Sequence, residues 1–473
     1  MCYGYDALNR IRHIRYGNGV ETAYAYDGDG NVRTLETRAG KTVLLSFAYR
    51  YDGNGNRTAK TGTQATLGGI ISGSNVLDIS YAYDVRGQLL EERRNGASVC
   101  YAYDKAENRI RKTDAQGEIR YLYNAKNQLI TEESPADRNQ FSYDRQGGII
   151  EEKNLAGIRL FSYNNRHQQT RVETETGNVQ ENRYDAEGLR FELLENGRRT
   201  SFVYHDGELL HEEGREEQGT SYHLGAGMEA FRRGQELSYY HRDEQLSTVF
   251  VTDGQGEIRN SYQYDAFGIP LETTEQLNNR IRYTGQQYDD VTGQYYLRAR
   301  YYNPVAGRFM QEDVYQGDGL NLYAYCGNNP VVYDDPSGYA STSIGKACPP
   351  QGKISESVDG SGTSSTTAGF DDWLGKGATD NKVYFGMKDG TAQYTGITKQ
   401  TKNARLNQHN NAGKAFDDLD IQYEGLTRNQ ARAIEQYYIE NGPNALNKIN
   451  SISPNNKYYQ DAMNWAKQYL GVE

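Results

Sequence analysis

Aromatic and polar residues alternate along most of this chain, and one kind of turn interrupts the alternation at regular intervals. The segments YAYDGDGNVRTLE, YAYDVRGQLLEE and YLYNAKNQLITE alternate into a tyrosine, continue through Asp/Asn-x-x-Gly/Asn, and then alternate again. The anchor tyrosines recur every 20 or 21 residues, at Tyr83, Tyr103, Tyr123, Tyr143, Tyr163, Tyr184 and Tyr204. Because a period of two is typical of strands, each unit predicts a β-hairpin.

These hairpins are expected to associate. A single two-stranded hairpin is marginally stable in water, so the repeated hairpins should pair edge to edge in one long sheet that buries the tyrosine face. The Asp or Asn after each tyrosine is predicted to cap its turn by accepting hydrogen bonds from backbone amides. We therefore assign these residues a structural role and no catalytic one.

The periodic pattern ends at about residue 339. Serine, threonine and glycine dominate residues 340–378, and such a composition cannot bury enough apolar surface to order itself. This segment is predicted to be a tether, with Trp373 and Leu374 as an exception that docks on a flanking domain.

A second, smaller domain is predicted for residues 379–473. VYFGM and AQYTGIT flank a Lys-Asp-Gly turn, which indicates a hairpin whose turn uses the positive φ of glycine. The segment TKNARLNQHNNAG then predicts a helix that opens at Thr398 or Thr401. Arg405 and His409 lie four residues apart, so they share one face of this helix.

Two further helices complete this domain. TRNQARAIEQYYIENG predicts a helix with Thr427 as its N-cap and Gly442 as its stop. Ala431 and Ile434 lie on its apolar stripe, and Glu435 lies beside that stripe. YYQDAMNWAKQYL predicts a final helix, so the domain is a small α/β one.

Composition agrees with a tyrosine-rich β protein. The chain has 473 residues, of which 36% are hydrophobic, with 41 tyrosines against 12 phenylalanines and two tryptophans. Tyrosine suits strands in which the ring packs while the hydroxyl reaches a polar partner. The length predicts about two to four domains. Four cysteines lie far apart without metal-ligand spacing, which predicts free thiols.

Net charge and hydropathy limit the partners. The net charge of -11 makes the whole molecule a poor general binder of nucleic acid or anionic membranes, so such a partner needs a local basic patch. No apolar run approaches the roughly 20 residues of a membrane span, and MCYGYDALNR does not make a signal peptide. We expect either export without a cleaved signal or a chain that is a piece of a longer protein.

The repeated units from about Tyr3 to Gly338 resemble the YD repeats of Rhs proteins, of insecticidal toxin-complex components and of teneurins. Residues 281–339, including GQYYLRARYYNPVAGRFMQEDVY, are similar to the hallmark that ends an Rhs core. The resemblance implies a mainly β fold in which residues 1–339 form a spiralling, hollow β-shell that holds a C-terminal toxin. The repeats are fewer than a complete shell requires, so either the shell is partial or the first residue is not the native start.

The same resemblance implies a cleavage site. Rhs cores end with two Asp-Pro-x-Gly elements, implicated in self-cleavage just downstream. The second is intact at Asp335, whereas the first, separated from it by 18 residues, keeps only Asp313 and lacks the Pro and Gly. Two carboxyls that share one proton would cut after Tyr339. The alternatives are that the second element is only a turn, or that Asp334 is the acting carboxylate.

The second domain resembles the GIY-YIG nuclease superfamily over about residues 382–447. The matching positions, in family order, are Lys382-Val383-Tyr384, Tyr394-Thr395-Gly396, Arg405, His409, Glu435 and Asn447. The first motif has Lys-Val-Tyr for Gly-Ile-Tyr, and the second has a threonine where the family has a hydrophobic residue. Both motifs keep the tyrosine.

This resemblance implies metal-dependent phosphodiester hydrolysis. Glu435 would hold Mg²⁺ or another divalent cation, and Tyr384 would be the general base, with a pKa lowered by the metal and by Arg405. Tyr394 would orient or share that proton, and Arg405 would clamp the phosphate. His409 would be a second donor or proton shuttle.

Four further residues are candidates for the substrate side of the site. Asn447 would position the phosphate or the metal-binding carboxylate, and Lys382, Gly396 and Lys402 would contact substrate. Between residues 382 and 414 there are six basic residues and one acidic residue, a local positive lobe that suits a phosphate-binding site.

Each assignment has a plainer alternative. Tyr384 and Tyr394 could be ordinary cross-strand aromatics, the basic pair on the first helix could be a solvated face, and Glu435 could be an ion-pair partner of Arg432 or Arg428.

Together the resemblances imply an Rhs-type polymorphic toxin with a C-terminal nuclease that acts on target-cell nucleic acid, DNA in preference to RNA. They also imply a cognate immunity protein, a secretion-system component or chaperone, and delivery into a rival cell. One alternative is an adhesive or carbohydrate-binding YD-repeat protein with an inert cap. The other is an Rhs toxin with a different, RNA-directed activity.

Overall fold

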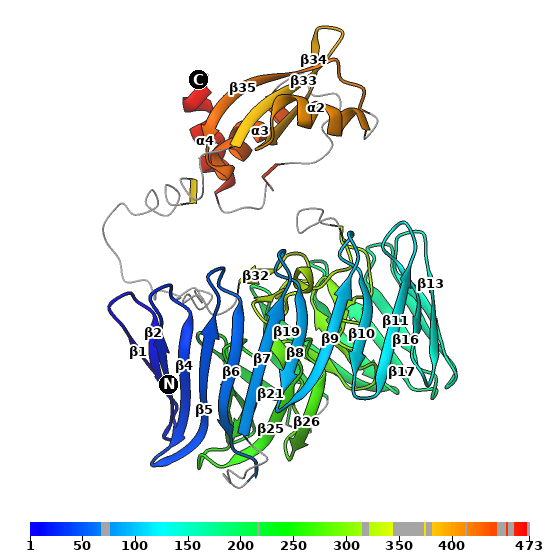
Figure 1. Cartoon of the computed structure of the whole chain (residues 1–473). Helices are drawn as coiled ribbons and strands as arrows, with labels where there is room; N and C mark the ends of the chain where they lie inside the picture. The colour runs from blue at the N-terminus through cyan, green and yellow to red at the C-terminus, as the bar shows by residue number, and fades with distance from the viewer. Residues whose placement is uncertain are drawn as a thin grey trace. The chain divides into compact units, whose positions relative to one another are not determined.

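The computed structural model describes residues 1–67, 76–214, 218–314, 321–343, 373–374, 381–411, 414–441, 451–452 and 458–470. The chain forms two compact units, Met1–Ile354 and Ser355–Glu473. The first is built almost entirely of strands, and the second combines strands with helices (Figure 1).

The first unit contains one antiparallel sheet in which each strand pairs with the next along the chain. Its strands are β1 (Cys2–Tyr5), β2 (Ile11–Arg15), β3 (Val20–Tyr26), β4 (Val32–Ala39), β5 (Thr42–Tyr51), β6 (Arg57–Gln64), β7 (Val76–Tyr83), β8 (Leu89–Arg94), β9 (Ala97–Tyr103), β10 (Arg109–Asp114), β11 (Gly117–Tyr123), β12 (Leu129–Glu133), β13 (Arg138–Tyr143), β14 (Ile149–Lys153), β15 (Ile158–Tyr163), β16 (Gln169–Glu173), β17 (Val179–Tyr184), β18 (Arg190–Glu195), β19 (Arg198–His205), β20 (Glu208–Glu213), β21 (Thr220–Leu224), β22 (Met228–Arg233), β23 (Glu236–Arg242), β24 (Thr248–Thr252), β25 (Ile258–Tyr264) and β26 (Pro270–Glu275). The predicted series of hairpins is confirmed.

The Asp after the repeat tyrosine caps its turn, as predicted. Asp84 Oδ1 accepts hydrogen bonds from the backbone amides of Arg86 (2.8 Å) and Gln88 (2.9 Å). The same pair of bonds recurs at Asp27, Asp52, Asp104, Asn124, Asp144, Asn164, Asp185, Asp243, Asp253 and Asp265. These carboxylates and amides satisfy backbone donors that the turn would otherwise leave unpaired.

The repeat tyrosine joins each hairpin to the one before it. Tyr103 Oη donates to the carbonyl of Leu89 (2.9 Å), the first residue of β8 in the preceding hairpin. Eight other tyrosines make the same kind of bond at 2.6–3.1 Å: Tyr26, Tyr51, Tyr83, Tyr123, Tyr143, Tyr163, Tyr184 and Tyr264. Each ring is therefore held at one position by its own strand and by its neighbour's backbone.

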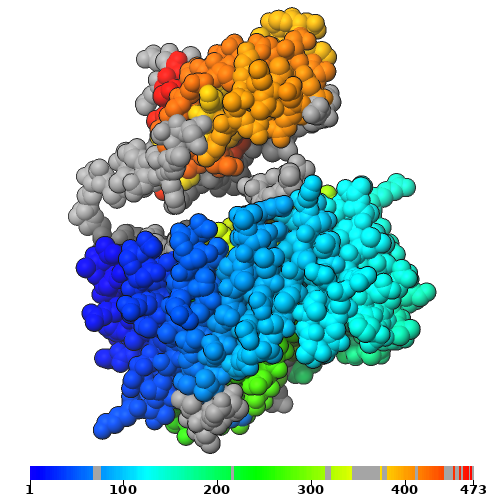
Figure 2. Space-filling view, in the orientation of Figure 1, coloured from blue at the N-terminus to red at the C-terminus, as the bar shows by residue number. Residues whose placement is uncertain are grey.

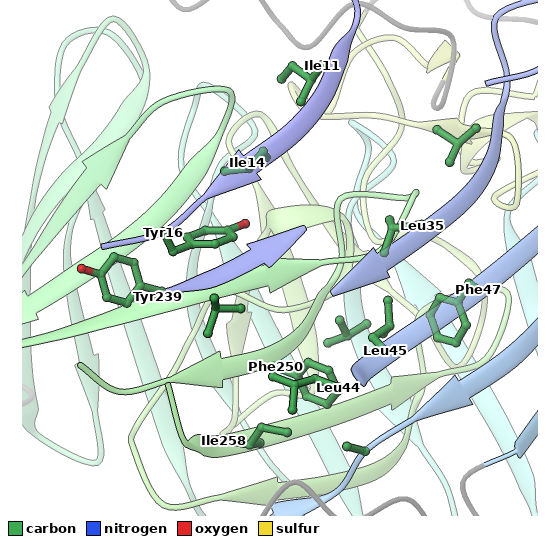
Figure 3. Close-up of a cluster of buried hydrophobic side chains, with 14 of the residues drawn as sticks. Ile11, Ile14, Tyr16, Leu35, Leu44, Leu45, Phe47, Tyr239, Phe250 and Ile258 are labelled. Carbon is green, nitrogen blue, oxygen red and sulfur yellow. The ribbon is translucent and has the colours of Figure 1, made fainter. Parts of the chain in front are cut away.

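The sheet curls until its first and last strands face each other (Figure 1). Ile14, Leu35 and Phe47 from β2, β4 and β5 share one buried cluster with Tyr239 and Phe250 from β23 and β24 (Figure 3). The strands from β1 to about β11, blue to cyan in Figure 2, form a continuous outer face. Side chains from both layers meet in this cluster, so the two layers are in direct contact here. The predicted hollow chamber stays a prediction.

Buried charges also cross between the two layers. Arg57 on β6 pairs with Glu244, which also accepts a hydrogen bond from Tyr49, and Lys60 lies 3.0 Å from Asp243. Charges removed from water are costly unless paired, and losing one partner of such a pair is strongly destabilising. The two faces must therefore meet in one register.

Residues 281–343 form a separate layered region against the inside of the curl. It contains two short 3-10 helices, η3 (Tyr283–Gly285) and η4 (Cys326–Asn328), a four-stranded sheet of β27 (Gln287–Asp289), β28 (Gln294–Leu297), β29 (Arg300–Asn303) and β30 (Arg308–Phe309), and the pair β31 (Tyr333–Asp334) and β32 (Thr342–Ser343). Tyr296 and Tyr301 pack with Phe141 and Phe161 of the long sheet. This region therefore belongs to the core of the first unit.

Among its described residues, the second unit has a three-stranded antiparallel sheet in the order β34-β33-β35 and the helices α2, α3 and α4. Its strands are β33 (Asn381–Lys388), β34 (Thr391–Thr398) and β35 (Asp418–Leu426), and its helices are α2 (Lys402–Asn411), α3 (Arg428–Asn441) and α4 (Tyr459–Leu470). Thr427 caps α3 by accepting a hydrogen bond from the Gln430 amide (3.2 Å), whereas Gly442 lies outside the described residues. The sequence interpretation did not include β35.

Three features complete the comparison with expectation. Leu374 packs in a cluster with Ala433 and Ala462 of the second unit, so the predicted docking occurs there. Cys2, Cys100 and Cys326 are free thiols, as predicted, and Cys348 lies outside the described residues. None of the described helices has the length and apolar character that crossing a bilayer requires.

Removing one repeat hydroxyl should measure the coupling between hairpins. Tyr103→Phe leaves the Leu89 carbonyl without its donor while keeping the ring, so we expect a loss of about 1–3 kcal/mol in the free energy of unfolding of the first unit. The measurement is a urea titration followed by circular dichroism. Tyr5→Phe is the matched control, because Tyr5 also precedes a turn Asp but makes no hydrogen bond with described residues through its hydroxyl. Equal losses in the two variants would contradict the coupling.

Candidate active site

Two tyrosines and two glycines face each other across β33 and β34. Tyr384 pairs with Gly396, and Gly386 pairs with Tyr394. A Cβ on Gly396 would lie 2.6 Å from Tyr384 Cζ and 2.7 Å from Tyr394 Cε1, so only glycine leaves room for both rings. The residue that the sequence pattern placed in substrate binding therefore makes space for the two tyrosines.

Tyr384 is hydrogen-bonded to both predicted residues of α2. Arg405 Nε donates to Tyr384 Oη (3.0 Å), and Tyr384 Oη lies 2.6 Å from His409 Nε2. A guanidinium can only donate, so the tyrosine oxygen accepts from Arg405. The second bond joins Tyr384 Oη to His409 Nε2, and its direction depends on the His409 tautomer. Tyr384 is the donor when the imidazole is neutral with its proton on Nδ1.

Burial controls the protonation of this pair. Desolvation lowers the pKa of His409 to about 4, with the positive charges of Arg405 and Lys414 as further causes. Desolvation also raises the pKa of Tyr384, although Arg405 opposes the change. Arg405 lowers the pKa of Tyr384, as expected, but burial outweighs this single guanidinium. The expected contribution of a metal ion stays a prediction.

Tyr394 lies in the same cluster. Its ring centroid is 6.3 Å from that of Tyr384 and 5.3 Å from that of His409. The Nζ of Lys414 lies 3.6 Å from the centroid of Tyr394, a cation–π contact. The sequence interpretation counted Lys414 in the basic lobe but gave it no role, and the local sequence carries no sign of this contact.

Glu435 on α3 is buried and electrostatically part of the cluster. Its negative charge raises the pKa of Tyr394 and of Tyr384, and the charges of Arg405 and Lys414 act on Glu435 in return. Desolvation nevertheless raises the pKa of Glu435 above its usual value.

Glu435 fits a single-carboxylate cation site. The hydroxyl of Ser451 donates to Oε2, and no described side chain donates to Oε1. A buried carboxylate with one open oxygen and a raised pKa is stabilised in its ionised form by a cation. No group of three or more potential metal-ligating side chains occurs among the described residues, so any ion here would take most of its ligands from water and substrate.

The remaining candidates of this domain do not join the cluster. Lys382 pairs with Glu424 (2.9 Å), and Lys402 pairs with Asp418 (2.8 Å). These carboxylates neutralise the charges that the sequence interpretation gave to substrate. Asn447 lies outside the described residues.

A second cluster lies at the end of the first unit. Arg300 approaches Asp313 (2.8 Å) and Asp335 (3.5 Å) through the same guanidinium nitrogen, so a cation lies beside both carboxylates. Asp335 Oδ1 accepts hydrogen bonds from the amides of Gly338 (2.8 Å), Tyr339 (3.2 Å) and Ala340 (3.3 Å).

Asp335, and not Asp334, contacts the predicted scissile bond. Ala340 supplies the nitrogen of the predicted scissile bond, and this nitrogen lies within hydrogen-bond distance of Asp335. Burial raises the pKa of Asp335. Asp334 instead accepts from the Thr342 hydroxyl (2.6 Å), and burial raises its pKa to about 6.

The protonation of His409 should be visible by titration. A folded-state pKa of about 4 keeps the imidazole neutral from pH 8 down to about pH 5, and Arg405→Gln should move that pKa toward the ordinary value by removing a positive charge. Nitrogen-15 NMR of the ring follows both states. Because this pKa is depressed, the associated stability is present above about pH 6.5 and is lost as pH falls toward 4. A wild-type midpoint near 6.5 would contradict the buried Tyr384–His409 contact.

Comparison with known proteins places the long sheet in a family context. The family described as the teneurin YD-shell matches residues 69–331, and the family described as the RHS repeat matches residues 5–43. In solved structures, the TcdB2-TccC3-Cdc42 crystal structure superposes with a TM-score of 0.60 at 21% identity over 71% of this chain and 19% of that chain. That likeness shows the fold alone.

Two curated relatives are named for toxic or nucleolytic activities. The tRNA3(Ser)-specific nuclease WapA of Bacillus spizizenii is 39% identical over 177 residues, which cover 33% of this chain and 7% of WapA. The double-stranded DNA deaminase toxin A of Burkholderia cenocepacia is 33% identical over 122 residues, which cover 24% of this chain and 8% of that protein. The chain thus spans less than a tenth of the length of either relative.

Proposed function

Because the chain belongs to the teneurin YD-shell family, we propose that it is an Rhs-type polymorphic toxin whose second unit is a GIY-YIG-like endonuclease. The observation that carries the proposal is the convergence of Tyr384, Arg405 and His409 on one hydrogen-bonded group that also feels the charge of Glu435. The names of the relatives support the toxin assignment.

The proton arrangement suits activation of water. With the His409 proton on Nδ1, Tyr384 would pass its own proton to His409 Nε2, and the phenolate left behind would take a proton from the attacking water. Arg405 stabilises the phenolate that would form and offers its remaining donors to a phosphate oxygen. Tyr394 and Lys414 lie beside this group and contact each other. The ammonium of Lys414 would add positive charge where the phosphate gains negative charge.

The carboxylate of Glu435 is the residue that would hold a divalent cation, with Mg²⁺ as the first candidate. When bound, such an ion supplies Lewis-acid stabilisation to the phosphate oxygens and lowers the pKa of nearby acids. The high pKa of the buried tyrosine makes this added positive charge useful, since Arg405 alone does not overcome the desolvation of Tyr384.

The substrate is target-cell nucleic acid, with DNA as the first candidate. The WapA name favours transfer RNA as the second. A nuclease of this kind would harm the cell that makes it, so we propose a cognate immunity protein and a secretion-system component or chaperone as partners. Delivery into a rival cell would follow. Enclosure of the nuclease by the YD-repeat shell stays a prediction.

A nuclease assay on the full chain tests the proposal. With Mg²⁺, we expect cleavage of plasmid DNA or total RNA that chelator abolishes. Glu435→Gln and Tyr384→Phe should each lower the rate by about a hundredfold or more, the range reported for loss of one transition-state group. Lys467→Gln on α4 is the control for loss of a positive charge elsewhere in this unit.

The products separate the alternatives. Loss of RNA alone supports the RNA-directed toxin. Absence of cleavage of either polymer contradicts a nuclease and favours the adhesive protein with an inert cap.

We also propose self-cleavage after Tyr339, favoured by the Asp335 contact with the Ala340 nitrogen. Asp335 would start protonated on Oδ2 and give that proton to the leaving Ala340 amine, while Asp313, kept ionised by Arg300, takes a proton from the attacking water. In this scheme Arg300 lies beside both carboxyl groups and holds them in place.

Mass spectrometry of the purified full chain measures this cleavage. We expect two fragments that meet at Tyr339 and Ala340, and a single intact chain for Asp335→Asn. Asp334→Asn should still be cut, since Thr342 engages that carboxylate instead. Cleavage that survives Asp335→Asn, or an intact wild-type chain, contradicts the proposal.

A further inference from the structure

A groove of about 330 Å³ opens beside the candidate active site on the second unit. It is lined by the end of β34, the loop that follows it, one face of α2 and the start of α3. The lining residues are Asn381, Ile397, Thr398, Lys399, Gln400, Arg405, Gln408 and Arg428. Pockets of about 300 Å³ and larger hold small organic ligands, so the groove has room for one such group.

The groove is positively charged. Lys399, Arg405 and Arg428 contribute three positive charges, and no carboxylate is among the lining residues. The other two lysines considered for substrate, Lys382 and Lys402, are each paired with a carboxylate. The lining residues of this groove therefore carry positive charges and no negative one.

Arg428 is the lining cation without a hydrogen-bond or ion-pair partner among the described residues. It is the first residue of α3 and is exposed, and it makes no hydrogen bond or ion pair with any residue that the structure describes. Arg432, one turn later, donates to the Ser451 carbonyl (2.8 Å from Nε). The free guanidinium at residue 428 thus remains available to a phosphate, for which its planar donors are well suited.

Arg405 connects this groove to the chemistry. Its Nε donates to Tyr384, and its side chain also lines the groove. A nucleic-acid strand that presents one phosphate to Tyr384 would place the next phosphate in this groove. An isolated anion could occupy only one of the two positions.

We propose that this groove seats the phosphate next to the scissile one on a nucleic-acid strand, with Arg428 as its principal contact. The inference rests on the proposed nuclease function and adds the side from which the substrate strand enters. It makes the substrate a polymer of at least two phosphodiester groups, because a single phosphodiester reaches Tyr384 without filling the groove.

The test measures binding and cleavage separately on the full chain. Fluorescein-labelled oligonucleotides of DNA and of RNA are titrated by anisotropy with the Glu435→Gln background, and cleaved by the protein with Glu435 intact. Arg428→Gln should weaken binding roughly tenfold, raise KM with kcat little changed, and lower the slope of log Kd against log salt by about one. Arg428→Lys should restore part of the affinity, and Lys467→Gln should leave it unchanged.

Replacing one phosphate at a time along the oligonucleotide with a neutral methylphosphonate shows which phosphate binds in the groove. At the position next to the scissile bond it should remove the difference between wild type and Arg428→Gln, and at distant positions it should leave that difference intact. Equal effects of Arg428→Gln and Lys467→Gln overturn the groove, provided that both variants melt at the wild-type temperature.

The result remains distinct from the nuclease test. If the wild type cleaves but Arg428→Gln behaves like the Lys467→Gln control, the nuclease proposal is supported and the groove proposal is contradicted. If nothing is cleaved yet Arg428→Gln alone weakens binding, the groove stands as a nucleic-acid site and the catalytic proposal falls.

Discussion

The first unit depends on one hydrogen bond, from a repeat tyrosine to the backbone of the preceding hairpin. A hairpin meander has few contacts between repeats beyond strand pairing, and strand pairing alone tolerates slippage in register. Tyr123 prevents such slippage because its hydroxyl reaches one carbonyl, that of Arg109, at 2.8 Å. A shift by one residue would turn the ring to the outer face, so the bond and the burial of the ring select the same register.

That bond also explains how a chain with so many polar groups forms a core. Each tyrosine buries a large ring yet satisfies its hydroxyl, whereas phenylalanine would leave the bulged carbonyl unpaired. The same principle extends to charges. Arg190 is fully buried among Tyr296, Tyr301 and Asp289, and it links the long sheet to the region that fills its curl. Such contacts require a filled interior, because each charge needs its partner on the facing layer.

Sequence reasoning recovered what is encoded locally and missed what depends on distant contacts. The period of the tyrosines and the caps at Asp84 and its equivalents follow from a few neighbouring residues. The burial of Phe47 and Phe250 in one cluster does not, since neither strand carries a pattern that identifies the other. In the second unit the tyrosine–glycine pairs follow from two short motifs, but the ion pair of Lys382 with Glu424 required the position of β35. The alternating Leu419, Ile421 and Tyr423 of β35 were the signal available for that strand.

Arg405 is the central cation of the candidate site in the second unit. It donates to Tyr384, which also contacts His409, while burial keeps the pKa of Tyr384 high. In the proposed nuclease, a phosphate that engaged the other nitrogens of Arg405 would draw positive charge away from the tyrosine oxygen and would make phenolate formation harder. Substrate binding and base activation would then compete for one cation. Lys414 and an ion on Glu435 would relieve that competition, which would explain a buried acidic residue beside these donors.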